Sequence, residues 1–405
     1  MSDVPTKTLS GMNKFAENAK AQMEGLIKNK NMWGVLYLWI VIFLLVFVLA
    51  VYYKGKLSLR GENNARMSGD YKNIGGTKIA GINAGNAMHK HLLRDYYVKS
   101  SYNSCCGGNV EKDFVDMVPL TETIKRGARL LDFEIYSKDG EPIVAAGPNP
   151  SPDGKHCLKG TYNSLPLQNV MQRVRVLAFS GRYAPNPDDP LFLSFRIKTN
   201  NRNIYPIMAR KIGNTFRGMF LGPKFRYEGK DNRNGRGVLP NVPLLNLRRK
   251  VIIFVDDPNN NYRGTEFWSY VNISGKSKDG TSMPFFKTYR NYDIVQAYDP
   301  KSIKEENKKF LAITMPDFSK VKENPPAAIH HSYGCQFVMM NYSELDANME
   351  YYRNFFNSKG SAFILKPDHL RYFERKIAPP PPQKKELSYA PRKMNMLGGV
   401  YNPRI

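Results

Sequence analysis

An uncharged stretch of 22 residues near the amino terminus restricts most strongly what this chain can be. It runs from Met32 to Tyr53 and reads MWGVLYLWIVIFLLVFVLAVYY, with no charged residue and no proline. A helix of this length is about 33 Å long, which is enough to cross the hydrocarbon core of a bilayer. Aromatic residues stand near both ends, where a span meets the two membrane interfaces. The sequence therefore predicts one transmembrane helix over residues 32–53 and a single-pass membrane protein.

Two other interpretations fit this stretch less well. A buried core helix is rarely this long and apolar on every face. A cleaved signal peptide has a shorter apolar segment, lies nearer the amino terminus and ends in small residues before the cleavage site. The flanking basic residues are similar in number on the two sides, so charge does not predict which side of the membrane the rest of the chain occupies.

Charge indicates the kind of partner better than it indicates the fold. Lysine and arginine number 60 against 35 aspartate and glutamate residues, which gives a formal net charge of +25. This surplus favours a partner with an anionic surface, and we expect anionic lipid or an acidic protein rather than nucleic acid. Four cysteines are too few for a disulfide framework and show no zinc-binding spacing, so no structural zinc site is expected.

One stretch of the chain mixes basic with aromatic residues. Residues 202–236 are strongly basic, and Phe216, Phe220, Phe225 and Tyr227 interleave with the cations. Such a pattern can stack on and neutralise nucleic acid, contact lipid headgroups, or form a solvated face over core aromatics. We expect a solvated face for half of these residues and a contact with an anionic protein or membrane for the rest.

Composition divides the chain into five segments. Residues 1–31 are polar with a weak helical pattern, and the predicted span at 32–53 follows. Residues 54–95 are rich in Gly, Asn and Lys, which predicts a linker. Residues 96–376 form the folded body. Residues 377–405 begin with a proline run and continue as a basic tail, which predicts an arm that lies on a partner, with an idle terminus as the alternative.

Short apolar runs in the body predict buried strands that alternate with helices. Amphipathic patterns over residues 167–178 and 345–356 predict helices that pack on a sheet. Alternation over the whole body is typical of an α/β protein, and a closed (β/α)8 barrel suits the size. The predicted strands cover residues 130–135, 143–146, 191–195, 251–255, 294–296, 311–314, 336–341 and 362–365.

Four pieces of the body, taken in order, resemble the catalytic barrel of eukaryotic-type phosphatidylinositol-specific phospholipase C. They are SSYN at 100–103, RLLDFEIYSKDGEPIVAAGPN at 129–149, PLFLSFRIKT at 190–199 and YGCQFVMMNYSELDANMEYYRNFFNSKGSAFILKPDHLR at 333–371. The last piece is the most specific. The resemblance implies an irregular (β/α)8 barrel, preceded here by one transmembrane helix, with its site at the carboxyl ends of the strands.

The resemblance also implies a chemistry, which depends on two histidines and a calcium ion. One histidine assists the attack of the inositol 2-hydroxyl on phosphorus, and the other acts on the leaving side. Carboxylates and an asparagine hold the calcium, which offsets the phosphate charge. Where the family reads SSHN this chain reads SSYN, so Tyr102 replaces the first histidine. Where the family reads HGHT this chain reads AGPN, so Pro148 replaces the second.

The positions that match the calcium ligands are partly kept. Asn103 keeps the family's asparagine. Asp132 and Glu134, in DFE, keep the two carboxylates of the family's ELD with their identities exchanged. Arg196, in LSFRI, replaces the last calcium-binding carboxylate of LSLEN.

These replacements predict a protein without phosphodiesterase activity. A tyrosine titrates near 10 and does not exchange protons at neutral pH as a histidine does near 6.5. Proline has no side-chain donor or acceptor, and general acid–base assistance is worth roughly 10²–10⁴-fold per group. Arg196 would face calcium with a like charge. We therefore expect neither a bound metal nor another cofactor, and calcium only if the chain is an active phospholipase.

The arginine itself suggests what replaces the metal. Arg196 is expected at the end of one strand, with Asp132 and Glu134 at the end of another, so a guanidinium could pair with both carboxylates. We hypothesise that Asn103, Asp132, Glu134 and Arg196 form an ion-pair remnant of the metal site. His330 and His331 precede the GCQ motif, where the family places headgroup-binding residues rather than its catalytic pair.

The sequence thus predicts a membrane-anchored, catalytically inactive phospholipase-C-like protein. It would act as a structural or binding module that tethers a membrane, through residues 32–53, to a protein partner. A further hypothesis places it in the internal membrane of a virion of a large DNA virus, with capsid proteins as partners; it depends on the anchor, the altered site and the basic arm. The alternative is an active or lipid-binding phosphoinositide phospholipase C-like protein.

Overall fold

The computed structural model describes most of the chain and divides it into two units. The first unit covers residues 1–371 and the second residues 372–405. In the second unit the described residues include a short turn that is closed by a bridge between Met396 and Tyr401. The described residues are 14, 17–25, 30–147, 158–229, 239–275, 286–318, 323–373, 391, 393 and 395–401.

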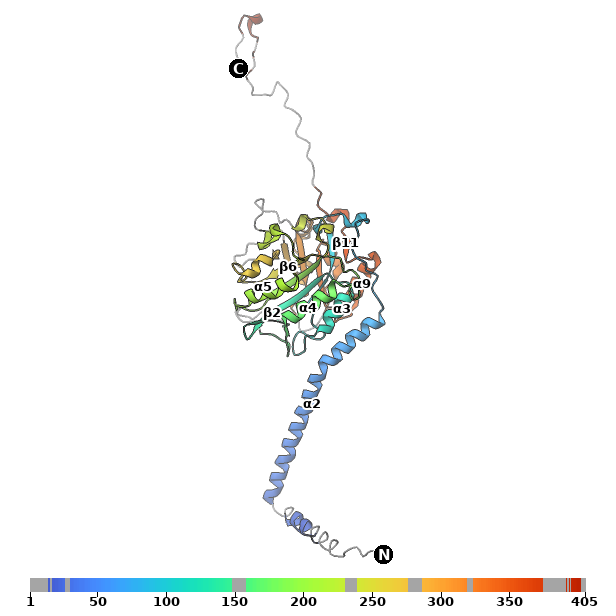
Figure 1. Cartoon of the computed structure of the whole chain (residues 1–405), viewed down its shortest axis with the longest axis vertical. Coiled ribbons are helices and arrows are strands. Elements are labelled where there is room, and N and C mark those ends of the chain that lie inside the picture. Colours follow the sequence, from blue (N-terminus) through green and yellow to red (C-terminus); the bar gives the residue numbers. More distant parts are fainter. Residues whose placement is uncertain are drawn as a thin grey trace. The chain divides into compact units, whose positions relative to one another are not determined.

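Within these described residues, eight parallel strands form a nearly closed barrel (Figure 1). The strand order is β7-β6-β5-β2-β1-β10-β9-β8. The strands are β1 (Tyr96–Ser101), β2 (Leu130–Lys138), β5 (Leu191–Ile197), β6 (Val251–Asp256), β7 (Ile273–Ser274), β8 (Phe286–Arg290), β9 (Leu311–Met315) and β10 (Phe337–Met340). The α/β barrel predicted from the sequence is confirmed.

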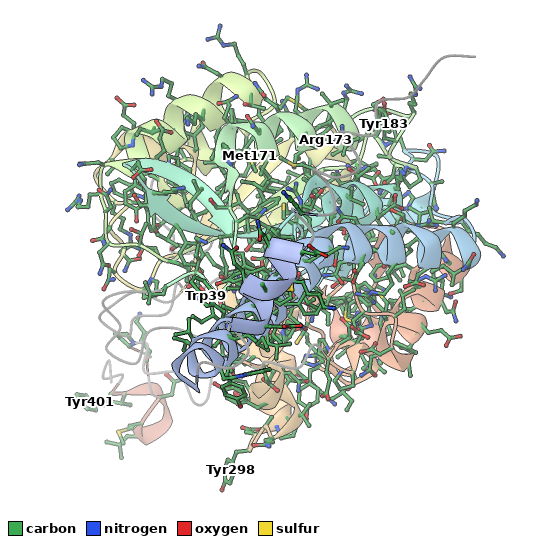
Figure 2. The ribbon with its side chains drawn as sticks, turned by 90° about the horizontal axis from the view of Figure 1, so that it is seen from below. Trp39, Met171, Arg173, Tyr183, Tyr298 and Tyr401 are labelled. Atoms are coloured by element: carbon green, nitrogen blue, oxygen red, sulfur yellow. The ribbon has the colours of Figure 1, made fainter. Side chains whose placement is uncertain are left out.

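Helices cover the outside of the barrel, and three short strands extend the sheet. Antiparallel β3 (Glu141–Ala145) pairs with β2, β4 (Leu165–Pro166) with β3, and β11 (Phe363–Leu365) with β1. Helix α4 is an example of a helix with one buried and one exposed face: Met171 is buried, whereas Arg173 is exposed (both labelled in Figure 2). The helices are α3 (Met117–Lys125), α4 (Leu167–Ala178), α5 (Ile204–Thr215), α6 (Asn291–Val295), α7 (Pro300–Lys309), α8 (Ala327–Ser332) and α9 (Ala347–Lys359).

Alternation along the strands decides which side chains face the barrel interior. Phe192 of β5, Phe254 of β6 and Phe337 of β10 meet there, with ring centroids 5.1, 5.3 and 5.5 Å apart. Because β10 is not a neighbour of β5 or β6 in the sheet, these contacts cross the barrel. Arg196 has the same parity as Phe192 on β5 and therefore also points inward, nearer the carboxyl end of the strand.

Helix α2 (Lys30–Asn73) contains the predicted span and continues well beyond it. Its side chains from Trp33 to Tyr53 are exposed, and the helix is long and apolar enough to cross a membrane. Residues 54–73, which the sequence predicted as linker, are helical. Glycines suggested a break there, but Met67 and Tyr71 are buried in the core of the barrel unit and hold this part of the helix in place.

Polar contacts attach this part of α2 to the barrel, and we call them the helix clamp. Arg60 binds Asp116, and the Asn63 amide donates to both carboxylate oxygens of Asp113 at 3.0 Å. Arg66 donates to the carbonyl oxygens of residues 107 and 343, each at 3.3 Å. Residues 107–116 follow β1, and residue 343 follows β10. The clamp therefore engages loops at the carboxyl ends of the strands.

Some element predictions differ from the structure. Residues 294–296 were predicted as a strand, but they include the end of α6, because a short apolar run does not distinguish a strand from a helix. Strand β1 was not predicted, since its buried Lys99, Ser100 and Ser101 hide the apolar pattern. The compact unit ends at Arg371, a few residues before the predicted end of the body.

Candidate functional site

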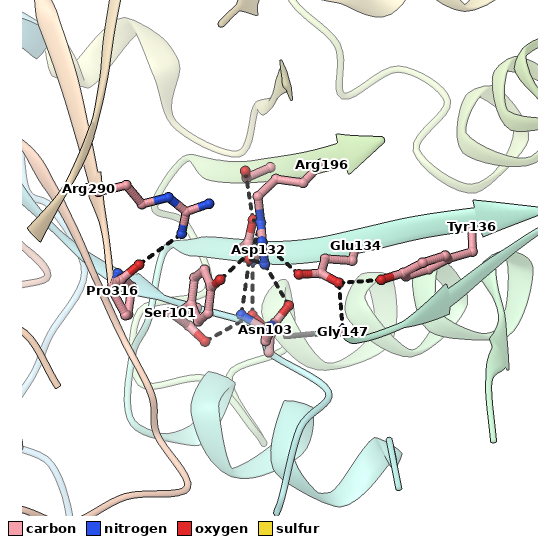
Figure 3. Close-up of polar contacts among 12 residues, drawn as sticks. Ser101, Asn103, Asp132, Glu134, Tyr136, Gly147, Arg196, Arg290 and Pro316 are labelled. Atoms are coloured by element: carbon pink, nitrogen blue, oxygen red, sulfur yellow. Dashed lines mark hydrogen bonds and ion pairs between the residues drawn. The ribbon is translucent and has the colours of Figure 1, made fainter. Parts of the chain in front are cut away.

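Of the positions matched to the family's catalytic and calcium-binding residues, all except Pro148 meet at the carboxyl ends of β1, β2 and β5 (Figure 3). Pro148 lies outside the described residues. The register explains the meeting, because Arg196 on β5 pairs with Glu134 on β2, and Ser194 pairs with Asp132. Arg196 is 2% exposed, and both carboxylates are buried. We call Tyr102, Asn103, Asp132, Glu134 and Arg196 the Arg196 cluster.

The guanidinium of Arg196 uses all five of its N–H donors inside the cluster. Nε donates to Asp132 Oδ1 at 3.0 Å and Oδ2 at 3.1 Å, and Nη2 donates to Asp132 Oδ2 at 2.7 Å. Nη2 also donates to Asn103 Oδ1 at 2.6 Å. Nη1 donates to Glu134 Oε1 at 2.8 Å and to the Tyr102 hydroxyl at 3.1 Å. No donor of this arginine remains for a bound phosphate.

Other groups also donate hydrogen bonds to the two carboxylates. The Ser194 hydroxyl donates to Asp132 Oδ1 at 3.0 Å. The Tyr136 hydroxyl and the Gly147 amide donate to Glu134 Oε2 at 2.8 and 2.9 Å. Sequence reasoning missed these three residues. Ser194 and Tyr136 each stand two residues from a cluster member on the same strand, so the alternation of strand side chains could have indicated them.

Backbone geometry at Asn103 brings the loop after β1 into the cluster. Asn103 has φ of 41°, in the left-handed region that asparagine tolerates better than most residues. Its amide donates to Asp132 Oδ2 at 3.0 Å while its side-chain oxygen accepts from Arg196. One residue thus contacts both members of the main ion pair.

Charge inside the cluster keeps Arg196 protonated. Burial alone would lower the pKa of its guanidinium, but attraction to Asp132, together with Tyr102 and Glu134, raises that pKa above its ordinary value. The Tyr102 ring adds to the environment of the cation, since its centroid lies 4.3 Å from Cζ of Arg196. Two carboxylates and one guanidinium leave a formal charge of −1.

A cavity of about 190 Å³ opens beside the cluster. Tyr102 and Gly147 line it, so the cavity lies on the side of Tyr102 and of the loop after β3. Arg290, at the end of β8, donates to the Pro316 carbonyl at 2.8 Å (Figure 3). The other lining residues are Val110, Asn291, Pro316, Asp317, Phe318, Glu323, Asn324, Pro325, Pro326, Asn341 and Asn348.

The two histidines that precede the GCQ motif lie on α8 and are buried. Burial lowers the pKa of His330 to about 4, and its Nε2 lies 3.0 Å from Asn291 Oδ1. Burial, together with His330 and Lys366, lowers the pKa of His331 to about 3. Its ring packs against Tyr97 and Phe355, each with centroids 4.5 Å apart. Both histidines are therefore neutral at pH 7.

Comparison with known proteins identifies the fold. No protein-family model matches the sequence. A search of curated protein sequences finds no match. Among solved structures, PLC21 of L. pealei matches with a TM-score of 0.57 and 19% identity, over 71% of this chain and 38% of that chain. PLC21 of S. officinalis matches with a TM-score of 0.55 and 18% identity, over 74% and 40%.

The chain has the fold of a phospholipase C catalytic barrel. The fold that the sequence resemblance implied is confirmed. This chain spans about two fifths of the length of the two PLC21 proteins. A Ca²⁺-dependent phosphatidylinositol-specific phospholipase C from Streptomyces antibioticus also matches, with a TM-score of 0.44 and 10% identity, over 68% of this chain and 99% of that chain.

Proposed function

We propose that this chain is a membrane-anchored protein with a phospholipase C fold that does not hydrolyse phosphoinositide and that holds a protein partner beside the membrane. The Arg196 cluster carries the proposal. A guanidinium lies among the carboxylates that the family resemblance assigns to calcium, and every one of its donors is used there. A buried, fully hydrogen-bonded ion pair of this kind is a structural arrangement.

The residues of the cluster do not fit a calcium ion. Calcium takes six to eight oxygen ligands. Here Asp132, Glu134 and Asn103 already direct their oxygens to Arg196, so a cation among them would have to displace the guanidinium. Within the described residues, no group of three or more His, Cys, Asp or Glu side chains is placed to hold a metal ion. We therefore derive no catalytic step through a metal.

Proton transfer also lacks a suitable group among the described residues of the cluster. The Tyr102 hydroxyl accepts from Arg196, and a phenol is a poor proton carrier at neutral pH. His330 and His331 are buried and neutral, and no hydrogen bond joins them to the cluster within the described part of the chain. His156 lies outside the described residues and is the first histidine to replace if activity is found.

The helix clamp explains how the barrel would sit at a membrane. Arg60, the first clamp residue, lies seven positions after Tyr53, the end of the apolar stretch, which is about 10 Å along a helix. Because the clamp engages loops at the carboxyl ends of the strands, this end of the barrel would face the bilayer. The amino ends of the strands would then face away from it, toward a partner. The virion and its capsid remain a sequence prediction.

The test uses the full chain in nanodiscs, with labelled phosphoinositide as substrate and calcium present. We expect no release of inositol phosphate above that of empty nanodiscs. Calorimetry on the same preparation should show no calcium binding tighter than about 1 mM. As a matched comparison, R196E restores a carboxylate and should bind calcium more tightly than the wild type. Turnover by the wild type, or stoichiometric calcium binding, would contradict the proposal.

A further inference from the structure

The amino ends of the barrel strands carry a group of exposed cations. One of these residues lies in the loop that precedes β5 and the other five lie in the connection that precedes β6, and all of them are exposed. We call them the basic end face. They are Arg182, Arg217, Lys224, Arg226, Arg248 and Arg249.

Backbone hydrogen bonds place these loops at the same end of the barrel. The amide of Leu191 donates to the carbonyl of Lys250, and the amide of Arg249 donates to the carbonyl of Asp188, both at 2.9 Å. These bonds join the loops that precede β5 and β6. The amide of Glu228 donates to the carbonyl of Val271 at 2.9 Å, which joins the loop of Lys224 and Arg226 to the start of β7.

Negative charge does not balance this face. In residues 179–190, 216–229 and 239–250, the acidic side chains are Asp188, Asp189 and Glu228. Asp189 and Glu228 are buried and hydrogen bonded within the fold. Asp188 alone reaches the surface in these ranges, and Arg248 and Arg249 already bind its two oxygens at 3.1 and 2.6 Å.

Two ordinary explanations do not account for the basic end face. Lysine and arginine often stand in the last turn of α-helices, where they offset the helix dipole. None of the six cations lies within α4 or α5, the helices that lead to these loops. Stacking on nucleic acid would need exposed aromatics between the cations. Of the four interleaved aromatics, Phe216 and Phe225 are buried in the core and only Tyr227 is exposed, so these described loops offer one ring beside the cations rather than a series of them.

We propose that the basic end face binds an acidic protein surface. The proposal rests on the function proposed above, because it names where the partner would bind. Arginine predominates on the face, and its planar fork suits carboxylates, as the contact of Arg248 and Arg249 with Asp188 already shows. The helix clamp engages the opposite end of the barrel, so this face points away from the bilayer that α2 would cross.

The test compares two charge-matched variants of the full chain in nanodiscs of neutral phosphatidylcholine. One variant neutralises four cations of the basic end face, and the other neutralises four exposed cations that lie outside it, at the end of β2, in segments after β1 and β5, and in the first turn of α7. Fluorescein-labelled poly-L-glutamate is the probe, and a single-stranded DNA oligonucleotide and phosphatidylserine vesicles serve as the other anions. The variants are R182Q/R217Q/K224Q/R226Q and K112Q/K138Q/R202Q/K301Q.

The first variant should bind poly-L-glutamate about tenfold more weakly than the wild type, and the second within about twofold. Equal losses in the two variants would show that only net charge matters and would overturn the proposal. It would also be overturned if the first variant lost more affinity for DNA or for phosphatidylserine than for poly-L-glutamate. Both variants should melt within 2 °C or so of the wild type, since the substituted side chains are exposed.

The proposed function fails by a different measurement. Release of inositol phosphate by the same preparations would contradict the non-catalytic function but would not change the affinity of the basic end face for poly-L-glutamate. If the first variant bound poly-L-glutamate as tightly as the wild type, the proposal that the chain does not hydrolyse phosphoinositide would be unaffected. The two proposals can therefore fail separately.

Discussion

The two ends of the barrel both carry arginine, and they use it in opposite ways. At the carboxyl ends of the strands, Arg196 is buried and binds two carboxylates and an amide. At the amino ends, the Arg249 side chain is 56% exposed and shares the single carboxylate of Asp188 with Arg248. Burial therefore decides whether a cation stabilises the barrel or remains available to another molecule.

Removing the buried arginine should have the largest effect. R196A leaves Asp132 and Glu134 buried without their cation, so we expect the free energy of unfolding to fall by roughly 3–5 kcal/mol. Urea unfolding followed by circular dichroism measures this loss. As a control, R196M/D132N/E134Q removes all three charges and should recover part of the lost stability. A loss below about 1 kcal/mol in R196A would show that the cluster is not a structural ion pair.

A second buried cation, Lys366, forms no salt bridge with the residues that the structure describes and should make stability depend on pH. Its Nζ donates to the Asn307 carbonyl at 2.9 Å, and burial lowers its pKa to about 7, with Cys335 and Asp95 offsetting only part of the effect. The unfolded chain binds this proton up to about pH 10.4. The contribution of Lys366 to stability is therefore least favourable below pH 7 and should become more favourable as the pH increases from 7 toward 10.

K366M removes this group, so the rise in the free energy of unfolding between pH 7 and pH 9 should be smaller by about 2 kcal/mol. Urea titrations at several pH values measure the difference. The buried Lys99, whose pKa burial also lowers to about 7, keeps part of the slope, and K99M/K366M should flatten it further. An unchanged slope in K366M would mean that Lys366 stays charged inside the fold.

Releasing the helix clamp should have an intermediate effect that is local. R60A/N63A removes two contacts between α2 and the loop after β1, so residues 54–73 should open more often while the barrel stays folded. Protease cleavage in this region should be about 5–30-fold faster, which corresponds to a loss of one or two kcal/mol. K54A changes an exposed residue outside the clamp and is the control. Equal cleavage of the two variants would show that Arg66 and the buried Met67 and Tyr71 are sufficient to hold the helix.

The exposed arginine should matter least for stability. R249A removes one of two partners of an exposed carboxylate, so the free energy of unfolding should fall by less than about 1 kcal/mol. The same urea experiment measures it, and the small loss should disappear at high salt because exposed charges are screened. If R249A cost as much as R196A, burial would not explain the difference between the two ends.

The barrel could be predicted from the sequence where strands are continuous apolar runs. Strands such as Val251–Asp256, buried over almost their whole length, give that signal. The sequence did not predict β1, in which Lys99 and two serines are buried because neighbouring backbone and side-chain groups satisfy them. It also did not predict that α2 continues past the span, because a surface helix needs only a few buried residues.

The site could be predicted by residue type but not by geometry. The positions of Tyr102, Asp132 and Arg196 followed from the resemblance, and their proximity followed from the meeting of strand ends. The supporting contacts of Ser194 and Tyr136 depend on strand register, which the sequence alone does not determine. The basic end face required the fold as well, since its cations come from two separate connections, one before β5 and one before β6.

Helix α2 runs without interruption from the apolar stretch to the clamp. The orientation of the barrel about the helix axis therefore depends on the number of residues between the two. Each residue added between Tyr53 and Arg60 would turn the barrel by about 100° about the helix axis and lift it by about 1.5 Å. Seven added residues would nearly restore the original orientation about the helix axis and would shift the barrel by about 10 Å along that axis. In the membrane-anchored arrangement proposed above, the length of this short connection would set both the orientation of the barrel about the helix axis and its distance from the bilayer.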